Sequence, residues 1–294
     1  MPEAVRITGR MNEMENNFNS PDQVILGNIK TGVVKAERSI LQMILLGIMA
    51  GAFIALGGAT SNVAVHGIAD VGLSRALAGA IFPVGLMLIV FVGGELFTGN
   101  CLISMAVLDK KTSVGKMIRN LVIVYFSNLA GALIIDFLIF FSGELNYSGG
   151  GLGAYTIKVA LAKVNISPVA GVTSGILCNM LVCLAILAAG AAKDIAGKIW
   201  AIFFPMWAFV IGGFEHCVAN MFYIPAGMLA ASNPDYVAKA EELYGITAEQ
   251  CAGLTVINSF NNFIPVTIGN IIGGAVFIGL MYFLIVVKTG KKAQ

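Results

Sequence analysis

The chain has 294 residues, of which 57% are hydrophobic and 12% are charged, and its formal net charge is +2. An ordinary soluble domain has about a quarter of its residues charged, so this composition excludes a water-soluble globular protein. The small net charge gives no reason to expect a nucleic-acid partner.

The first 38 residues are polar and mixed in charge, without an apolar stretch followed by a small-residue cleavage site. A cleaved signal peptide is therefore not expected, and this segment is predicted to stay in the cytoplasm. Ser20, Pro21 and Gln23 supply an N-cap, a proline at the first helical position and a capping-box glutamine. They predict that a short helix begins here. Its apolar residues recur at helical spacing up to Arg38, which favours an amphipathic helix that lies on the inner face of the membrane. The alternative is a solvated segment that precedes the first span.

Long uncharged runs follow, and runs of roughly 20 apolar residues match the thickness of a bilayer's hydrocarbon core. They predict a channel domain of six transmembrane helices at residues 39–288, followed by a cytoplasmic tail at residues 289–294. The expected spans cover roughly residues 40–62, 76–108, 120–142, 169–192, 199–230 and 264–287. The second and fifth are too long and too interrupted to be single straight helices.

The basic residues predict the orientation of the spans. With the amino terminus inside, fourteen of the 18 Lys and Arg residues lie in inner segments. The four at the outer side are Arg75, Lys158, Lys163 and Lys239. Because cytoplasmic loops carry an excess of Lys and Arg, this asymmetry predicts that both termini are cytoplasmic.

The second and fifth spans share an interruption. Residues 93–95 and 212–215 each place a glycine pair before a glutamate, midway through their span. Spans three and six share a further echo, Asn-Leu-Ala-Gly at residues 128–131 against Asn-Ile-Ile-Gly at residues 270–273. These echoes predict two inverted three-helix repeats, each with one helix broken at the midplane, which is typical of a permeation site.

The interruptions are predicted to line the pathway, because irregular backbone at membrane depth is tolerated only where it is buried in protein or lines a wet cavity. Half-helix ends would aim backbone N–H groups at a passing anion. His216, at the second interruption, titrates near neutral pH and is the expected proton donor; a histidine satisfied by neighbouring carbonyls is the alternative. Glu95 and Glu215 could carry protons or could accept free backbone N–H groups and brace the break, and bracing is favoured for Glu95.

Three further polar residues lie away from the two interruptions. Lys163 follows a glycine-rich outer loop at the mouth of the fourth span, where a lysine either attracts anions or snorkels to the interface. Asp136 stands alone in the third span without a partner that the sequence identifies. Cys251 is the one cysteine outside the apolar segments and is expected to be exposed.

Four segments, in this order, carry a resemblance to a known family. They are residues 94–100 (GELFTGN), 175–185 (GILCNMLVCLA), 213–222 (GFEHCVANMF) and 262–270 (NFIPVTIGN). From about residue 21 to 288, the chain closely resembles the formate/nitrite transporter family. The resemblance implies an all-α, aquaporin-like homopentamer in the lipid of a prokaryotic inner membrane, with a pore in each protomer and without cofactor or metal.

The resemblance also implies roles for particular residues. Thr98 matches the family's threonine in the loop that interrupts the second span, and His216 matches its central histidine; together they would bind or protonate the anion. Lys163, Asn179 and Glu215 match the polar set that leads from the outer vestibule to the histidine. The matched apolar constrictions are Phe82 and Leu86 on the outer side, and Leu96 and Phe209 on the inner side.

A channel or transporter for small monovalent anions and protons is the function that the resemblance implies, with formate foremost. Gly99, Asn100 and Cys217 replace small polar residues of many formate and nitrite members, and branches that resemble hydrosulfide channels share Gly-Asn, so nitrite and hydrosulfide stay open. A membrane enzyme that uses Cys217 with His216 is disfavoured because neighbouring helical side chains point about 100° apart. A structural subunit would not need two broken spans with ionisable groups.

Overall fold

Helices dominate residues 17–289, the part of the chain that the computed structural model describes. Residues 1–16 of the predicted cytoplasmic segment and residues 290–294 of the predicted tail lie outside this range. Within the described range there is no β-strand, and the single isolated β-bridge joins Phe18 to Ala192.

Six helices are long and apolar enough to cross a membrane. They are Ile40–Val65 (α3), Val71–Val92 (α4, Val71–Ile81, with α5, Val84–Val92), Val114–Ser142 (α8), Pro168–Ala191 (α10), Ile195–Gly212 (α11) and Val256–Thr289. The last begins with α15 (Val256–Ile271) and continues through π-helical turns and α16 (Met281–Phe283). The chain is therefore a multi-pass membrane protein with six spans, as the sequence predicts.

Two shorter apolar helices continue the second and fifth spans after a gap. Phe97–Leu108 comprises α6 (Phe97–Asn100), a 3₁₀ turn and α7 (Ser104–Leu108), and Cys217–Ala231 is α12. Residues 93–96 and 213–216 between the half-helices are not helical. The chain is thus interrupted at the two places where the paired glycines predict it.

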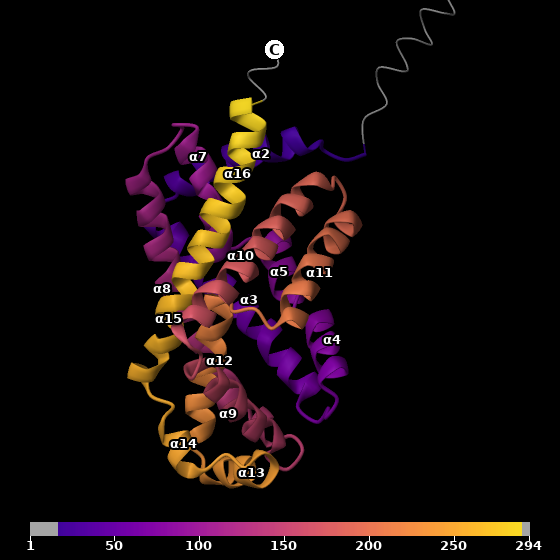
Figure 1. The fold of residues 1–294 in the computed structure, drawn as a ribbon, viewed down its shortest axis with the longest axis vertical. Helices are drawn as coiled ribbons and strands as arrows, with labels where there is room; N and C mark the ends of the chain where they lie inside the picture. Colours follow the sequence, from indigo (N-terminus) through magenta and orange to yellow (C-terminus); the bar gives the residue numbers. More distant parts are fainter. Residues whose placement is uncertain (1–16, 290–294) are drawn as a thin grey trace, which may run out of the picture.

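The short helix before the first span, α2 (Pro21–Glu37), begins as the capping box predicts. The backbone N–H of Gln23 donates to the Ser20 hydroxyl at 3.3 Å, and the Ser20 N–H donates to the Gln23 side chain at 2.8 Å. Ile25 and Ile29 are buried beside residues of α7 and α10. α2 therefore packs onto the bundle, and Figure 1 shows it at the same end as the described C-terminus.

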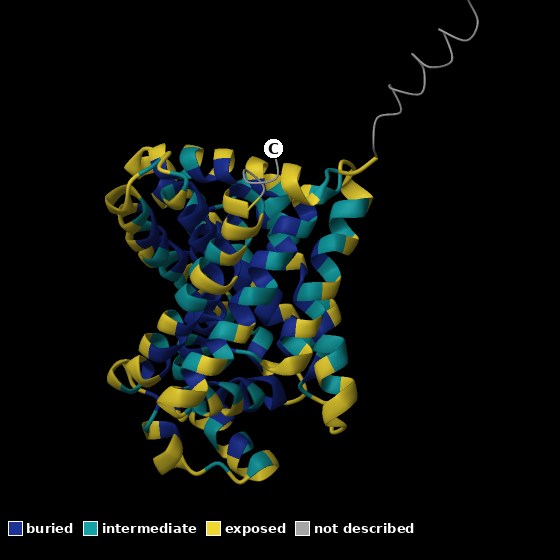
Figure 2. Ribbon diagram, turned by 45° about the horizontal axis from the view of Figure 1, so that its top comes forward, coloured by how far each residue is buried: buried dark blue, intermediate teal, exposed yellow. Residues whose placement is uncertain are grey.

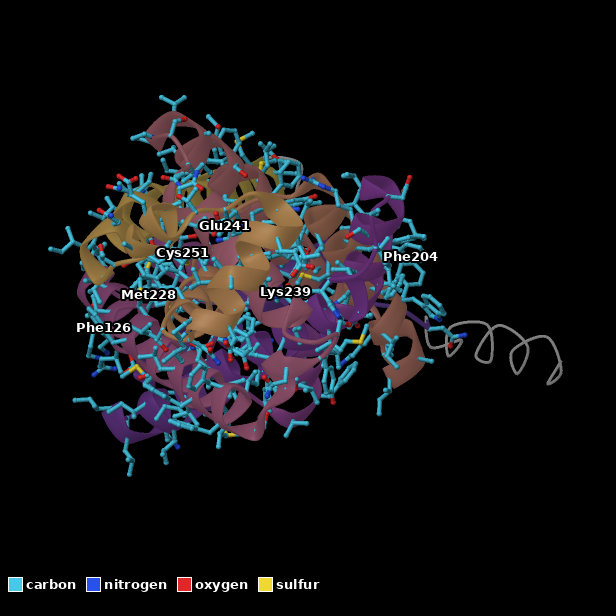
Figure 3. The ribbon with its side chains drawn as sticks, turned by 90° about the horizontal axis from the view of Figure 1, so that it is seen from below. Phe126, Phe204, Met228, Lys239, Glu241 and Cys251 are labelled. Atoms are coloured by element: carbon cyan, nitrogen blue, oxygen red, sulfur yellow. The ribbon has the colours of Figure 1, made fainter. Side chains whose placement is uncertain are left out.

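Three helices at the opposite end were not predicted: α9 (Gly151–Val164), α13 (Pro234–Tyr244) and α14 (Ala248–Ala252). They share a separate apolar cluster with the C-terminal part of α12. Figure 3 views the molecule from this end, with Lys239 and Glu241 on α13 and Cys251 on α14. Cys251 is 5% exposed, so its predicted exposure is wrong, and burial raises the pKa of its thiol.

Glycine lets the spanning helices approach closely. At Gly51 of α3, a side chain would collide with the carbonyl of Asn128 on α8, and at Gly269 of α15 it would collide with the carbonyl of Val172 on α10. Small residues at such crossings let helix backbones make van der Waals contact in a membrane. α3 packs most extensively against α8 and α10 against α15, and Figure 2 shows the buried residues gathered in the interior of the helix bundle.

Candidate functional site

An asparagine from the third span holds the first interruption. α5 ends at Gly93, whose φ of 104° is a conformation that glycine tolerates. The Asn128 side chain accepts a hydrogen bond from the Phe97 N–H at 2.9 Å and donates to the carbonyls of Glu95 (2.9 Å) and Gly47 (2.8 Å). One amide thus satisfies two backbone groups of the break and ties them to the Gly47 carbonyl of α3.

The second interruption has the same arrangement. α11 ends at Gly213, with φ of 66°. The Asn270 side chain, from α15, accepts from the Cys217 N–H at 2.9 Å and donates to the carbonyls of Glu215 (2.9 Å) and Gly175 (2.8 Å). The predicted echo between spans three and six therefore falls on the two residues that hold the breaks.

The Glu95 carboxylate does not brace the backbone as predicted, because its partners are side chains. It accepts from the Asn100 amide at 2.5 Å and lies 3.0 Å from Arg38 Nε and 3.4 Å from Lys35 Nζ. Lys35 also donates to Asn100 at 2.7 Å. Sequence reasoning missed Lys35 and Arg38, although both end the predicted amphipathic segment where it meets the first span.

Glu215 has a matching set of partners at the other end of the site. Its carboxylate lies 2.6 Å from Lys163 Nζ and accepts from the amides of Asn220 (2.7 Å) and Asn262 (3.1 Å). Asn262 also donates to the Lys163 carbonyl at 3.0 Å. Lys163 therefore points inward from the last turn of α9 and does not snorkel.

Thr98 and His216 join the two interruptions. Thr98 Oγ1 lies 2.9 Å from His216 Nε2, and both side chains are buried. The Ala219 N–H donates to His216 Nδ1 at 2.9 Å, so the histidine is the N-cap of α12. Because Nδ1 accepts that bond, a neutral ring carries its proton on Nε2 and donates it to Thr98 Oγ1. The Thr98 hydroxyl proton is then free to reach another acceptor.

The Asn179 side chain links the two interruptions. Its amide donates to the carbonyls of Thr98 at 3.1 Å and Asn270 at 2.6 Å. It therefore orients the backbone of Thr98 and links it to the residue that holds the second break.

The four residues expected at the constrictions are all buried: Phe82, Leu86, Leu96 and Phe209. The Phe82 and Phe209 rings meet edge to face with centroids 5.5 Å apart, and Phe209 lies 5.9 Å from the His216 ring. The structure therefore places Phe209 in contact with Phe82, and both belong to one buried cluster with Leu96. The reason is that the last turns of α11 meet the junction between α4 and α5.

Comparison with known proteins agrees with this geometry. The profile of the formate/nitrite transporter family matches residues 22–284. A probable formate transporter of Methanothermobacter thermautotrophicus is 39% identical, over 94% of this chain and all of the relative. The formate channel FocA of Escherichia coli K12 is 35% identical, over 88% of this chain and 91% of FocA.

Two solved structures share the fold. A pentameric formate channel with formate bound superposes with a TM-score of 0.73 at 33% identity, over 84% of this chain and 97% of that chain. An ion channel of the same family superposes with a TM-score of 0.76 at 27% identity, over 89% of this chain and 98% of that chain. The chain belongs to the formate/nitrite transporter family.

Proposed function

We propose that this protein carries formate across a prokaryotic inner membrane, along the path between Lys163 and Lys35, with His216 transiently protonating the anion at the centre. The Thr98–His216 hydrogen bond is the observation that carries the proposal, because it places a titratable ring and a hydroxyl where the two broken spans meet. The similar proteins described as formate channels support formate as the substrate.

Apolar residues set the barrier that protonation would remove. Phe82, Leu86 and Leu96 are each 2% exposed or less. An unpaired anion beside such side chains costs several kcal/mol or more, and a neutral acid avoids most of this cost. A free carboxylic acid of this kind has a pKa around 4, so near neutral pH the proton must be supplied within the pathway.

We infer an order of proton steps from the hydrogen bonds of His216. A neutral ring cannot release its Nε2 proton without first gaining one, so His216 would first take a proton at Nδ1 from water that enters the pathway with the anion, and would lose its bond to the Ala219 N–H. The imidazolium gives the Nε2 proton to Thr98, whose hydroxyl proton passes to a formate oxygen. Formic acid leaves, and the neutral ring now carries its proton on Nδ1.

The matched contacts of the interruptions support two inverted three-span halves. Asn128 and Asn270 make equivalent backbone bonds, and Glu95 and Glu215 each pair with a lysine and an asparagine. The Lys35 end corresponds to the cytoplasmic side if both termini are inside, as the basic residues indicate. We further infer a homopentamer, which the pentameric formate channel supports.

Nitrite and hydrosulfide gain little from the structure. Asn100 is one of the three residues that depart from the formate pattern. Its amide donates to Glu95 at 2.5 Å and to Asn120 at 2.8 Å, so it is used within the group of polar side chains around Glu95. A side chain at Gly99 would meet Ile186. Gly99 is therefore explained by helix packing and Asn100 by its hydrogen bonds to Glu95 and Asn120. Formate remains the first candidate substrate.

Liposomes with purified protein test the proposal. Uptake of isotopically labelled formate, nitrite and hydrosulfide would be measured at several pH values, together with the reversal potential under an imposed pH gradient. We expect formate to enter faster than nitrite or hydrosulfide, and each formate to be accompanied by one proton. A reversal potential that follows the formate gradient alone would replace protonation with an anion channel in which fixed dipoles stabilise the ion.

A further inference from the structure

Asp136 is a buried carboxylate that the anion pathway does not use. It lies in α8 and is 2% exposed. Both of its carboxylate oxygens lack a hydrogen-bond partner, and no cation of residues 17–289 lies within ion-pairing distance. A lone ionised carboxylate in such surroundings is costly enough that the group normally takes a proton instead.

A small cavity beside Asp136 contains a second unpaired polar group. It lies between α3, α8, α9 and α12, and its space for a water molecule is about 10 Å³. Asn62, which is 6% exposed, also lines it, and the Nδ2 amide of Asn62 has no hydrogen-bond acceptor. A volume of this size, about one water, can hold one where polar partners are available.

The chemistry of the two unpaired groups selects the occupant. A water molecule can accept from Asn62 Nδ2 and donate to Asp136, whereas a metal cation would face the amide hydrogens of Asn62 and find a single charged ligand. Water leaves the charge of an ionised Asp136 uncompensated, and a proton removes it. We propose that Asp136 holds a proton in a one-water site, so that α8 contains a proton-binding site separate from the His216 pathway.

The other side chains that line the cavity offer no better site for this proton than Asp136. The lining residues from α3, α9 and α12, which include Thr156 and Phe222, do not titrate, and Thr156 donates its hydroxyl to the Leu152 carbonyl at 2.8 Å. Glu144, after the end of α8, is the one other titratable group in the lining. Glu144 is half-buried, and this partial burial raises the pKa of its carboxyl group.

Infrared spectra of the full-length protein in liposomes test the site directly. At neutral pH we expect the carbonyl band of a protonated carboxylic acid, which shifts when aspartate is labelled with carbon-13. The band should be absent in Asp136→Asn and unchanged in Glu144→Gln. The labelling arm needs no variant, so it stands even if Asp136→Asn fails to assemble. A wild-type spectrum in which no protonated-carboxyl band shifts on labelling would overturn the proposal.

Thermal unfolding gives an independent readout. If the folded chain holds one more proton at Asp136 than the unfolded chain, wild-type stability falls relative to Asp136→Asn as the pH rises through the neutral range. We expect no difference between sodium, potassium and choline salts. Stabilisation of the wild type, but not of Asp136→Asn, by sodium or potassium would replace the proton with a metal cation.

Discussion

The two ring nitrogens of His216 have different partners and therefore different tasks. Its Nδ1 accepts the Ala219 N–H at the start of α12, and its Nε2 lies 2.9 Å from the Thr98 hydroxyl. The first task is structural and the second is the one proposed for transport. Substitutions that keep one task and remove the other can therefore distinguish them.

His216→Asn and His216→Phe form such a pair. Asparagine is a good N-cap, so His216→Asn should assemble and keep its thermal stability, but it cannot lend a proton near neutral pH and should lose the pH dependence of formate uptake. Phenylalanine removes the cap as well, at a cost of about 0.5–2 kcal/mol, and should abolish proton-coupled uptake. Uptake in liposomes and thermal unfolding of the same preparations measure both effects. Wild-type uptake and pH dependence in assembled His216→Phe would exclude the proton-donor role.

Lys163 should help transport chiefly by neutralising Glu215. Lys163→Ala leaves a buried carboxylate unpaired, which typically costs about 3–5 kcal/mol and adds a negative charge that repels anions. We expect slower formate uptake, most of all at low formate and low ionic strength. Lys163→Ala with Glu215→Gln should recover part of the loss, because both charges are then absent.

Lys158→Ala is the matched control for this prediction. Lys158 is on the same helix, and its ammonium lies over the Tyr244 ring, 4.3 Å from the centroid. It should change uptake little. If the two lysine variants behaved alike, the Lys163–Glu215 pair would have no special role.

At the scale of elements, the interruptions depend on two asparagines of the long third and sixth spans. Asn270→Leu would leave the Cys217 N–H and the Glu215 carbonyl unpaired and would remove their tie to α10 at the Gly175 carbonyl; each unsatisfied buried group costs about 1–3 kcal/mol. Asn128→Leu should be comparably harmful, because Asn128 makes three equivalent bonds. Thermal unfolding in detergent measures both. Asn261→Leu, an exposed position on α15, should change stability little.

The sequence predicted these elements through local signals. Hydrophobic length predicts the six spans, glycine pairs predict both interruptions, and Ser20 with Gln23 predicts the start of α2, because each signal acts within a few residues. The short helices α9 and α13 were missed. α9 follows a glycine-rich stretch, and its buried side chains contact α12 and α13, which are distant in sequence.

The site was only partly predictable for the same reason. Thr98, Glu215 and His216 lie at the interruptions, and a break at membrane depth is visible in the sequence. The partners of Glu95 come from α2 and from the residue after it, and nothing in the local pattern assigns Lys35 and Arg38 to a buried carboxylate. The contact between Phe209 and Phe82 depends on how α11 meets α4, which is a tertiary contact that no local pattern predicts.

At the scale of the whole molecule, apolar side chains cover the outside of the described helices. Phe126 on α8 is 63% exposed and Phe204 on α11 is 56% exposed, and Figure 3 shows them at opposite edges of the molecule. Lipid or neighbouring subunits must cover such edges. We predict that native mass spectrometry in mild detergent detects five chains of 30.8 kDa, and a monomer or dimer there would contradict the inferred pentamer.

A pentamer could conduct through each subunit or through a shared opening at its centre, and the contacts of the site favour the first. Thr98, His216, Lys163 and Glu215 all belong to one chain and meet inside it. Mixed pentamers of wild-type and His216→Phe chains should therefore take up formate in proportion to the wild-type fraction. Differently tagged chains, co-expressed and purified through both tags, allow this fraction to be measured by mass spectrometry. A shared pore that needs every subunit would lose activity much more steeply, and that curve would exclude independent pores.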